Sequence, residues 1–358
     1  MQVAVLLLGF TIAWSLAILL TSLSPPTDNI EQLNWVHRLD WGYYKHPPLP
    51  TWLLWLPTQL LGATAATSHA MGIGTNLVSL GLFWWLLKRL RGAHHATLAL
   101  LAVLCITYYN NRLPVYNHNT VLMLVSTACA ALTWKAMHGD RIRWWLALGL
   151  ALGLGALTKY QIGVTATSVL AFWLAQRGWR NPAQRRGLLL AVLLALLVFA
   201  PHLQWLRTHD FGPVAYALDS SLGARLAPDE RVLDAGNWLA DQLLNRSLAS
   251  WVLLMLCARA AIRCRAAPRP APDAARQLLW CWGLVPLAFM PVVGLAAGSR
   301  LHMPWGTPFL LFAIPAVMEL LRPRCTWDRV PLRPALGWFI LLQAALLLAS
   351  LLSSPKGP

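Results

Sequence analysis

The chain has 358 residues, of which 57% are hydrophobic and 12% are charged, and its mean hydropathy is +0.52. A soluble domain carries roughly 25% charged residues, so this composition excludes an ordinary soluble protein. The formal net charge of +16 would suggest a nucleic-acid partner in a soluble chain, but here the cations are distributed by loop. We therefore expect an all-α polytopic membrane protein and no nucleic-acid binding.

Apolar runs of roughly the 20 residues needed to cross a bilayer recur along the whole chain, and we count about eleven membrane helices. The first run has no positive residue before it and no small-residue cleavage site after it, so we expect a retained helix rather than a signal peptide. All of 1–358 is expected to form one membrane domain. The eleven runs are 3–22, 70–87, 96–109, 119–137, 143–157, 163–176, 187–206, 240–257, 277–297, 306–320 and 335–353.

The charged residues are divided unequally between alternate loops. Five loops, with the adjacent Glu319, hold 19 of the 29 Lys and Arg residues but 4 of the 13 acids. The positive-inside rule places these loops, and hence the N-terminus, in the cytoplasm. The opposite, extracytoplasmic side then holds the two longest loops, 23–69 and 207–239, while the Pro- and Ala-rich segment 259–276 is expected to be a cytoplasmic linker. The five loops are 88–95, 135–143, 177–186, 259–276 and 322–333.

Cysteine usage argues against both disulfides and a metal site. All six cysteines fall in predicted helices or cytoplasmic loops, and none shows metal-ligand spacing. We therefore expect no metal site and no certain cofactor, and a divalent metal has no support from the sequence. The cysteines are Cys105, Cys129, Cys257, Cys264, Cys281 and Cys325.

The first external loop is predicted to contain two interfacial helices. One begins with Thr27 or Asp28 as its N-cap and carries apolar residues at helical spacing up to Leu39. The other, LPTWLLWLPTQLLG, starts at Leu49 and is too short to span a bilayer but suited to the interface. Prolines deny a helix to the piece between them, Gly42 to Pro48. We expect this piece to direct its side chains at the membrane surface, namely Tyr43, Tyr44, Lys45 and His46.

Lys159 lies in the TKYQ hairpin between two helices of about 15 residues, or roughly 22 Å each at 1.5 Å per residue. Such a hairpin turns below the surface of a core about 30 Å thick, where a lysine is costly unless it faces a polar cavity or an anion. Two interpretations stay open: Lys159 extends upward to water, or it belongs to a phosphate site. Three more polar clusters are expected on the same side, at 108–120, 201–210 and 298–305.

The early external acid, the WGYY-x-HPPL run and the LTKY hairpin resemble motifs of the polytopic GT-C glycosyltransferases of the protein-mannosyltransferase-like and aminoarabinose-transferase-like group. The resemblance covers most of the chain and is strongest over 25–60, 150–162 and 200–212. It implies a bacterial inner-membrane enzyme that takes a sugar from a polyprenyl-phosphate carrier. It implies transfer on the extracytoplasmic side to a lipid, glycan or protein acceptor, while the sugar itself cannot be read from the sequence.

The sequence departs from the family pattern at two places. Relatives carry adjacent Asp-Glu twelve residues before the acid of DWGYY, whereas Asp28 is followed here by Asn29. Glu31 lies on the same helical face as Asp28 and offers a second carboxylate. Relatives that modify lipid A can have an acid and then Lys before the prolines, where this chain has Lys45 and His46.

Transfer from a phosphate-linked sugar needs a base for the acceptor and cations for the departing phosphate. We expect Asp28 to be the base, with Glu31 as its substitute or as a group that orients the acceptor. A single displacement would invert the anomeric centre. The donor phosphate is assigned to Lys45, His46, Lys159 and Arg300, and the substrate lining to Tyr43, Tyr44, Asn117, His118 and His302.

Each role has a simpler alternative. Asp28 would then be only an N-cap, Glu31 a solvated surface residue and His46 a turn residue. Arg112 and Arg207 most simply pair with external acids or lipid headgroups. The histidines at 118, 202, 209 and 302 are more often structural than catalytic. A transporter or carrier-lipid flippase is the competing function, although transporters place ionisable groups near the bilayer midplane, and a non-catalytic scaffold is the third.

Overall fold

The computed structural model describes residues 3–22, 24–139, 141–262 and 273–353, and within these ranges it contains helices and turns but no strand. The all-α polytopic fold is therefore confirmed. The longer helices are α1 (Val3–Thr21), α4 (Ala65–Arg91), α6 (His118–His138), α9 (Pro182–Thr208), α13 (Ala274–Ala297) and α15 (Leu332–Ser353). Each of these six is long and apolar enough to cross a membrane.

Shorter apolar helices account for the other predicted spans. They are α5 (Ala93–Val103), α7 (Ile142–Ala156), α8 (Ile162–Ala175), α12 (Leu248–Ile262) and α14 (Ala313–Leu321). Every predicted span thus overlaps an apolar helix of the structure, while the number that cross the bilayer stays a prediction. The remaining helices are α2 (Thr27–Trp35), α3 (Leu49–Leu61), α10 (Gly212–Ala217) and α11 (Pro228–Ala240).

Two predicted span boundaries were wrong. The run 240–257 starts with an η3 π-turn at Asp241–Asn245, and α12 begins only at Leu248. The run 306–320 starts at the end of a 3-10 helix, Met303–Gly306, continues as a turn and becomes α-helical only at Ala313. Pro304 and Pro308 cannot donate backbone hydrogen bonds there. Hydrophobicity alone did not reveal either irregular start.

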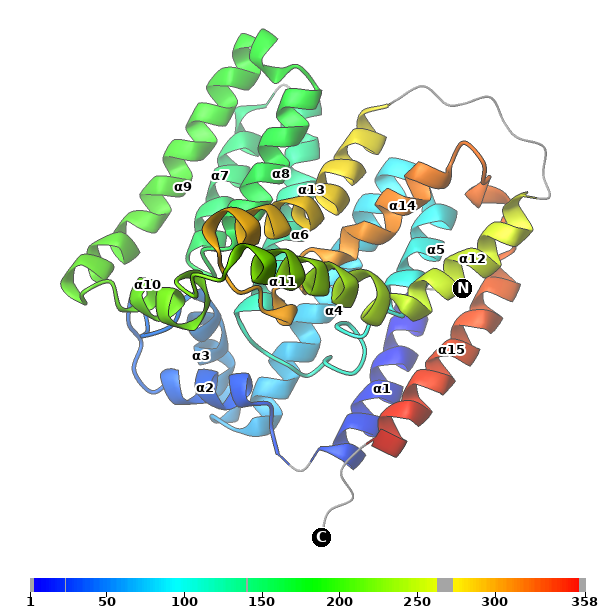
Figure 1. Ribbon diagram of the computed structural model, residues 1–358, viewed down its shortest axis with the longest axis horizontal. Helices are drawn as coiled ribbons and strands as arrows, with labels where there is room; N and C mark the ends of the chain where they lie inside the picture. Colours follow the sequence, from blue (N-terminus) through cyan, green and yellow to red (C-terminus); the bar gives the residue numbers. More distant parts are fainter. Residues whose placement is uncertain (1–2, 23, 140, 263–272, 354–358) are drawn as a thin grey trace.

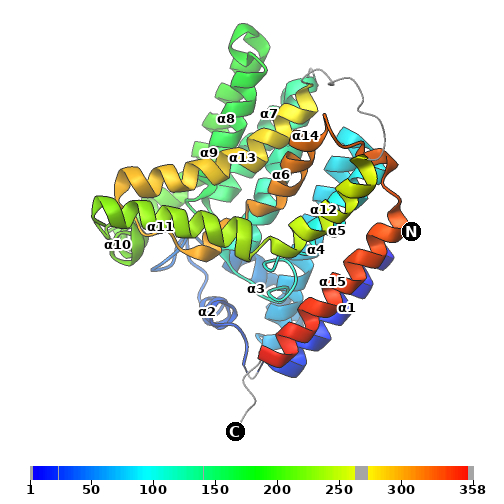
Figure 2. The same ribbon diagram turned by 45° about the vertical axis from the view of Figure 1, so that its right-hand side comes forward.

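The helices form three neighbouring groups in Figures 1 and 2. α7, α8 and α9 lie together at one side, α4, α5, α6, α13 and α14 occupy the centre, and α1 lies against α15 at the other side. Trp14 of α1 donates to Gln343 of α15 at 2.9 Å, and this pair is therefore joined by a polar contact as well as by apolar packing. Helices α2 and α3 lie together at one end of the bundle (Figure 1).

α7 and α9 pack unusually closely because α7 presents glycines to its neighbour. A Cβ at Gly149 would lie 2.5 Å from the carbonyl oxygen of Ala191, and one at Gly153 would lie 2.6 Å from Val198. Small residues four positions apart let helix backbones approach in a membrane, where packing replaces the hydrophobic effect. This contact fixes the start of the α7–α8 turn, which carries Lys159.

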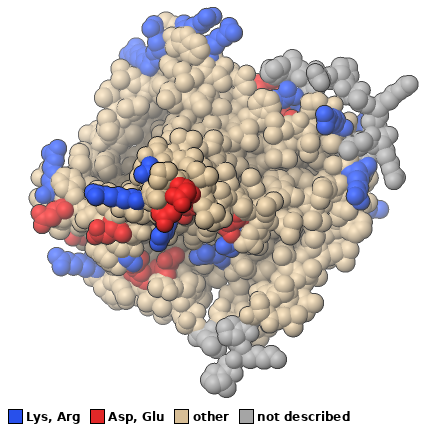
Figure 3. Space-filling model, viewed as in Figure 1, with Lys and Arg blue, Asp and Glu red and all other residues tan. Residues whose placement is uncertain are grey.

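The two ends of the bundle differ in charge. The α8–α9 connection carries Arg177, Arg180, Arg185 and Arg186 without an acid between them, and Figure 3 shows a blue cluster without red at that end. Red and blue residues mix around α10 and α11 (Figure 3). The segment 263–272 of the predicted linker, with Cys264, lies outside the described residues. The five described cysteines are free thiols: Cys105, Cys129, Cys257, Cys281 and Cys325.

Candidate active site

The WGYYKHPPL segment forms a tight turn that is anchored to α9. Tyr43 and His46 exchange two backbone hydrogen bonds of 2.9 and 3.2 Å. Nδ1 of His202 lies 2.6 Å from the carbonyl oxygen of Trp41, so Nδ1 carries the proton and Nε2 accepts from the hydroxyl of Tyr160 at 2.8 Å. His202 therefore ties the turn to both α9 and the α7–α8 hairpin, which is a structural role.

Gly42 is required by the same contact. A Cβ there would lie 2.4 Å from the ring of Trp205 on α9, so only glycine allows the turn to lie flat on this tryptophan. The turn is also bonded at its far end, where the Leu49 amide donates to the carbonyl oxygen of Leu157 at 2.9 Å. The turn is consequently held in place from α9 and from the hairpin of Lys159.

Two of the four turn side chains point inward, contrary to the prediction that all four face the membrane surface. The ring of Tyr43 is buried and stacks on Trp35 with centroids 4.7 Å apart. The ring of His46 lies 4.0 Å from that of His118, and burial, followed by the proximity of His118 and of Lys159, lowers the pKa of His46 well below its usual value. A neutral His46 follows, and only Tyr44 and Lys45 lie toward the outside.

Lys45 already has an anionic partner. Its ammonium lies 2.7 Å from Oε1 of Glu31, and the hydroxyl of Tyr44 donates to the same oxygen at 3.3 Å. Burial acts to lower the pKa of Lys45, but the hydrogen bonds to Glu31 and Tyr44 and the charge of Glu31 together outweigh it, and the pKa is raised. The rings of Tyr44 and Tyr216 also lie within 5.4 Å of the ammonium. Glu31 is thus a bound partner of Lys45 rather than a solvated residue.

Asp28 is not the N-cap of α2, as one sequence alternative had it. The cap residue is Pro26, which makes no side-chain cap bond, and Asp28 lies in the first helical turn. Its Oδ2 accepts a 2.7 Å hydrogen bond from the amide nitrogen of Asn117, the N-cap of α6. The carboxylate is half-buried and so is oriented by α6 while still reachable.

Asn29 is a positioning residue that the sequence marked only as a departure. Its side chain is fully buried, donates to the carbonyl oxygen of Pro114 at 3.0 Å and accepts from the amide of Tyr116 at 2.9 Å. A glutamate here would set a carboxylate against that carbonyl and lose the donor. The amide therefore holds α2 against the segment before α6, and this fixes where Asp28 lies.

Lys159 is bound by a neutral group. Its ammonium donates to Oδ1 of Asn119 at 2.6 Å and lies 5.5 Å from the ring centroid of Trp305. Burial lowers the pKa of Lys159 to about 7, although the charge of Asp28 raises it in part. The lysine is therefore close to losing its charge unless an anion joins it.

Arg300 and His302 lie apart from this arrangement. The side chain of Arg300 is exposed, and among the described residues its backbone amide donates to the carbonyl oxygen of Ser221. His302 is also exposed, 3.4 Å from the carbonyl oxygen of Ser220, although its ring lies 5.1 Å from Trp305. Among the described residues, neither side chain contacts Lys159, and their assigned roles stay predictions. No cluster of three His, Cys, Asp or Glu side chains suited to a metal occurs within the described ranges.

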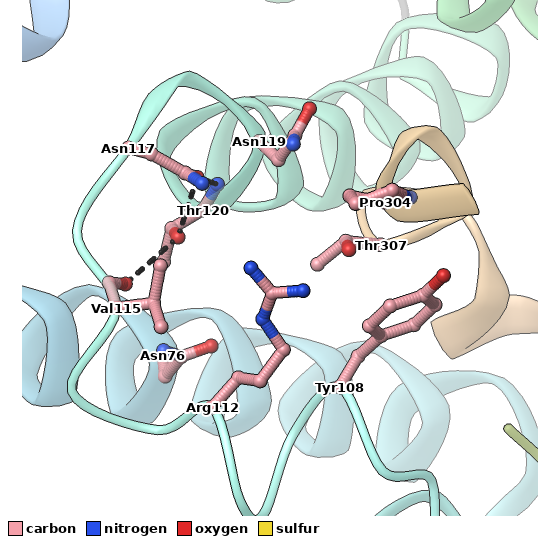
Figure 4. A pocket seen from close by; sticks show the side chains of 9 residues that line it. All are labelled: Asn76, Tyr108, Arg112, Val115, Asn117, Asn119, Thr120, Pro304 and Thr307. Atoms are coloured by element: carbon pink, nitrogen blue, oxygen red, sulfur yellow. Dashed lines mark hydrogen bonds between the residues drawn. The ribbon is translucent and has the colours of Figure 1, made fainter. Parts of the chain in front are cut away.

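A pocket opens beside the first turn of α6 (Figure 4). It encloses about 270 Å³ of empty space, part of it continuous with solvent. Asn117 and Asn119, which bind Asp28 and Lys159 respectively, both line it. The other lining residues are Asn76, Tyr108, Arg112, Val115, Thr120, Pro304 and Thr307. The sequence placed Asn117 near the substrate but did not indicate that Arg112 would enter the same pocket.

Comparison with known proteins gives this arrangement a family. Residues 45–205 match the family model described as dolichyl-phosphate-mannose-protein mannosyltransferase. The crystal structure of ArnT from Cupriavidus metallidurans bound to undecaprenyl phosphate superposes on 96% of this chain and 63% of its own, with a TM-score of 0.68 and 18% identity. The chain is thus similar to this family over residues 45–205, and its fold is that of ArnT over almost its whole length. It is accordingly a multi-pass membrane protein.

Curated GT-C relatives are similar over part of their length. The lipopolysaccharide core galacturonosyltransferase RgtA of Rhizobium johnstonii is 25% identical over 57% of this chain and 40% of its own. The lipid A galacturonosyltransferase RgtD of the same organism is 27% identical over 62% and 47%. An undecaprenyl phosphate-α-4-amino-4-deoxy-L-arabinose arabinosyl transferase of Pectobacterium carotovorum is 26% identical over 74% and 48%. The matches thus span less than half of these relatives.

The family match covers most, but not all, of the candidate site. Lys45, His46, Arg112 and Lys159 lie within residues 45–205, whereas Asp28 and Glu31 lie before them. The base is therefore assigned from the geometry of α2 and α6, and not from the family match.

Proposed function

We propose that the protein transfers a sugar from a polyprenyl-phosphate-linked donor to a lipid acceptor. One observation carries the proposal: a carboxylate and an ammonium are bound to two asparagines in the same turn of α6. Asp28 is bonded to Asn117 and Lys159 to Asn119. A base and a cation beside one pocket are what displacement of a phosphate-linked sugar requires.

In the proposed reaction the acceptor hydroxyl attacks the anomeric carbon in one step. Asp28 takes the hydroxyl proton, the new carbon–oxygen bond forms, and the bond from the anomeric carbon to the phosphate oxygen breaks. The phosphate leaves with that electron pair, and Lys159 stabilises its growing negative charge. A single displacement inverts the anomeric configuration, and no covalent sugar intermediate forms.

We assign the base to Asp28 rather than to Glu31. Oε1 of Glu31 is bonded to Lys45 and to Tyr44, whereas the carboxylate of Asp28 is bonded to the neutral amide of Asn117. In this proposal Glu31 holds Lys45 at the outer edge of the site, where the lysine contributes to attracting the carrier phosphate. His46 is neutral and half-buried, so it contributes shape rather than charge.

The relatives support the class of donor and acceptor but leave the sugar open. Their names include undecaprenyl phosphate as a carrier and lipid A or lipopolysaccharide core as acceptors. The named sugars are an acidic one, galacturonic acid, and an amino sugar, 4-amino-4-deoxy-arabinose. The names therefore support a lipid acceptor and do not decide the charge of the sugar.

We place the site on the extracytoplasmic side of a bacterial inner membrane. The arginine cluster of the α8–α9 connection lies at the opposite end of the bundle from α2 and α3 (Figures 1 and 3), and arginine-rich loops stay in the cytoplasm. Single cysteines introduced by Arg180→Cys and Asp219→Cys, in a background without native cysteines, test this. An impermeant thiol reagent applied to spheroplasts should label only the second, and the reverse pattern would overturn the orientation.

The decisive experiment for function is transfer by the purified protein in lipid vesicles. A polyprenyl-phosphate sugar and a lipid A acceptor are supplied, and the product is followed by mass spectrometry. Asp28→Asn and Asp28→Ala should each reduce the rate by about 100- to 10,000-fold, the range of general-base catalysis. The matched control is Asp229→Asn, an exposed acid in the first turn of α11, which should behave as wild type.

The same vesicles distinguish the competing transport function. A flippase would move the intact carrier-linked sugar across the bilayer without forming a product, and Asp28→Asn would not be expected to abolish that movement selectively. Transfer at the wild-type rate in both Asp28 variants would remove Asp28 as the base. Carrier movement without any transfer would overturn the enzyme proposal.

A further inference from the structure

The pocket beside α6 contains a cation that forms no ion pair with an acid of the described residues. Arg112 is its only charged lining residue, and Figure 4 shows the guanidinium extending into the middle of the pocket, between Thr120 and Thr307. None of the ion pairs or side-chain hydrogen bonds found among the described residues includes this guanidinium. Of the two simpler partners that the sequence suggested for Arg112, an external acid or a lipid headgroup, the first is therefore not found among the described residues, and the second stays a prediction.

Two other arginines on the same side of the molecule have partners among the described residues, whereas Arg207 and Arg300 are exposed to solvent. Arg246 pairs with Asp241 at 3.0 Å, and Arg231 donates to the carbonyl oxygens of Leu226 and Leu295. A guanidinium has five fixed donors and keeps its charge at all physiological pH values. Arg112 is half-buried and lines a pocket, where an unpaired charge costs more than on the open surface, so its position points to an anion supplied from outside.

The segment that carries Arg112 is held in place rather than loose. Asn29 bonds to Pro114 and Tyr116, and Asn76 of α4 donates to the carbonyl oxygen of Leu113 at 2.9 Å. On the other side of Arg112, the hydroxyl of Tyr109 donates to the carbonyl oxygen of Thr307 at 2.8 Å. The backbone on both sides of the arginine is thus fixed to α2, α4 and the 303–307 segment, and its direction into the pocket is built into the fold.

The rest of the pocket suits a monosaccharide. Oδ1 of Asn119 is taken by Lys159, which leaves its amide nitrogen as a donor, and the hydroxyl of Thr307 adds a group that donates or accepts. One sugar ring with hydroxyl groups and one anionic group matches this lining.

We infer that Arg112 binds a carboxylate on the transferred sugar, and hence that the donor carries a hexuronic acid rather than an amino sugar. The inference rests on the proposed function. Lys159, on the other side of Asn119, takes the carrier phosphate, and Arg112 takes the second anion of the same donor through a two-point Arg–carboxylate contact. The ammonium of an amino sugar placed at Arg112 would meet a like charge, and no acid is among the residues that line the pocket.

The test uses the full-length protein in lipid vesicles and three carrier-linked donors that differ only in the sugar: a hexuronate, the corresponding neutral hexose and an amino hexose. Wild type should bind and transfer the hexuronate best. Arg112→Gln should weaken the hexuronate donor by about 10- to 100-fold, the range for a hydrogen bond to a charged group, and change the neutral donor by less than about threefold. Arg112→Lys keeps the positive charge but loses the two-point guanidinium contact, so its hexuronate affinity should lie between those of wild type and Arg112→Gln.

The matched control is Arg207→Gln, an exposed arginine at the end of α9, which should leave all three donors unchanged. An equal loss with the hexuronate and neutral donors in Arg112→Gln, or weaker binding of polyprenyl phosphate without a sugar, would show that Arg112 holds the phosphate and would overturn the inference. So would an amino-hexose donor used as well as the hexuronate.

Donor binding is measured separately from transfer, by fluorescence quenching of the protein's tryptophans. If no donor is transferred, the proposed function fails, yet a hexuronate preference in binding that Arg112→Gln abolishes would still support the pocket assignment. Equal binding of the three donors by wild type would overturn it, whatever the outcome of the transfer assay. Retained binding of the neutral donor shows that each variant is folded.

Discussion

Buried charge is treated in opposite ways at the two ends of the molecule. Where α4, α13 and α14 meet, Arg91 lies 2.6 Å from Glu319 and 2.7 Å from Asp273, and two further arginines, Arg276 and Arg322, contact the same acids. At the pocket beside α6, Lys159 is bonded to an amide and Arg112 has no anionic partner among the described residues. At the first end, the buried cations form ion pairs with acids of the protein. At the second end, the cations lack such partners and are available to a ligand.

The difference separates structural from functional charge. A fully paired buried cluster joins three helices but offers nothing to a substrate, because its donors and acceptors are used. A cluster whose cations lack acidic partners destabilises the ligand-free protein slightly. Binding of an anion removes this destabilisation and so contributes to affinity. Four changes, from the largest expected effect to the smallest, test whether the two ends differ in this way.

The largest effect is expected at the paired end. Glu319→Gln removes the fully buried carboxylate that faces three arginines, and should lower the free energy of unfolding by about 3–5 kcal/mol, since it leaves buried cations uncompensated. Unfolding by detergent titration measures this. Asp273→Asn, at the more exposed acid of the cluster, is the control and should cost less. If the Glu319→Gln protein kept its stability and lost donor affinity, the charge cluster at Arg91 would be functional and not structural, and the proposed difference between the two ends would be wrong.

At the incomplete end, Lys159→Met should act on binding rather than on folding. Loss of the ammonium should weaken a carrier-linked donor about 10- to 100-fold, while the free energy of unfolding should change by no more than about 1 kcal/mol, because a costly buried charge leaves together with one hydrogen bond. Tryptophan quenching and detergent unfolding report the two effects. Unchanged donor affinity would remove Lys159 from the phosphate site.

The pH dependence of binding sharpens this assignment. The pKa of Lys159 is lowered to about 7, so Lys159 of the free protein loses its proton as pH rises through 7. Above that pH, part of the free energy of anion binding is used to protonate Lys159 again. Donor affinity should be constant below pH 7 and should fall by up to about tenfold per pH unit above it. His46 is neutral throughout this range because burial lowers its pKa. A phosphodiester-linked donor keeps a constant charge, and Lys159→Arg should make the profile flat.

The smallest effect is expected at Lys45 and Glu31, whose pair is partly exposed. Side-chain exposures of 25% and 19% put it near the surface class, worth about 0.2–1 kcal/mol. Lys45→Gln and Glu31→Gln should each lower the free energy of unfolding within that range, and the double variant gives the coupling between them. A coupling free energy of several kcal/mol would show that the Lys45–Glu31 pair behaves as a structural ion pair, as the Arg91 cluster does.

Much of the fold could be predicted because a membrane restricts what the backbone can do. Apolar runs in lipid must form helices to satisfy their own hydrogen bonds, and every predicted span overlaps a helix. The prolines of the first external loop likewise confined α2 and α3 to either side of Gly42–Pro48. The two wrong boundaries lie where a π-turn and 3-10 turns replace α-helix, and hydrophobicity does not distinguish these.

The candidate site was predicted by residue type and chemistry, but not by its contacts. The motifs placed Asp28, Lys45 and Lys159 among the functional residues. That His46 turns inward onto His118, that Glu31 binds Lys45 and that Asn29 anchors α2 all depend on residues 13 to 89 positions away in the chain. No local pattern records such distant contacts.

By itself the sequence determined the helices, the unequal charges of alternate loops and the identity of the reactive groups, because these follow from local hydrophobicity and side-chain chemistry. The tertiary structure decided which charges are paired. Arg91 and Arg112 are alike in the sequence, and only the packing of α4 with α13 and α14 gives the first its acids, while the fixed path of 108–117 turns the second into a pocket without one. Pairing depends on distances across the fold, and those distances make one arginine structural and the other available to a substrate.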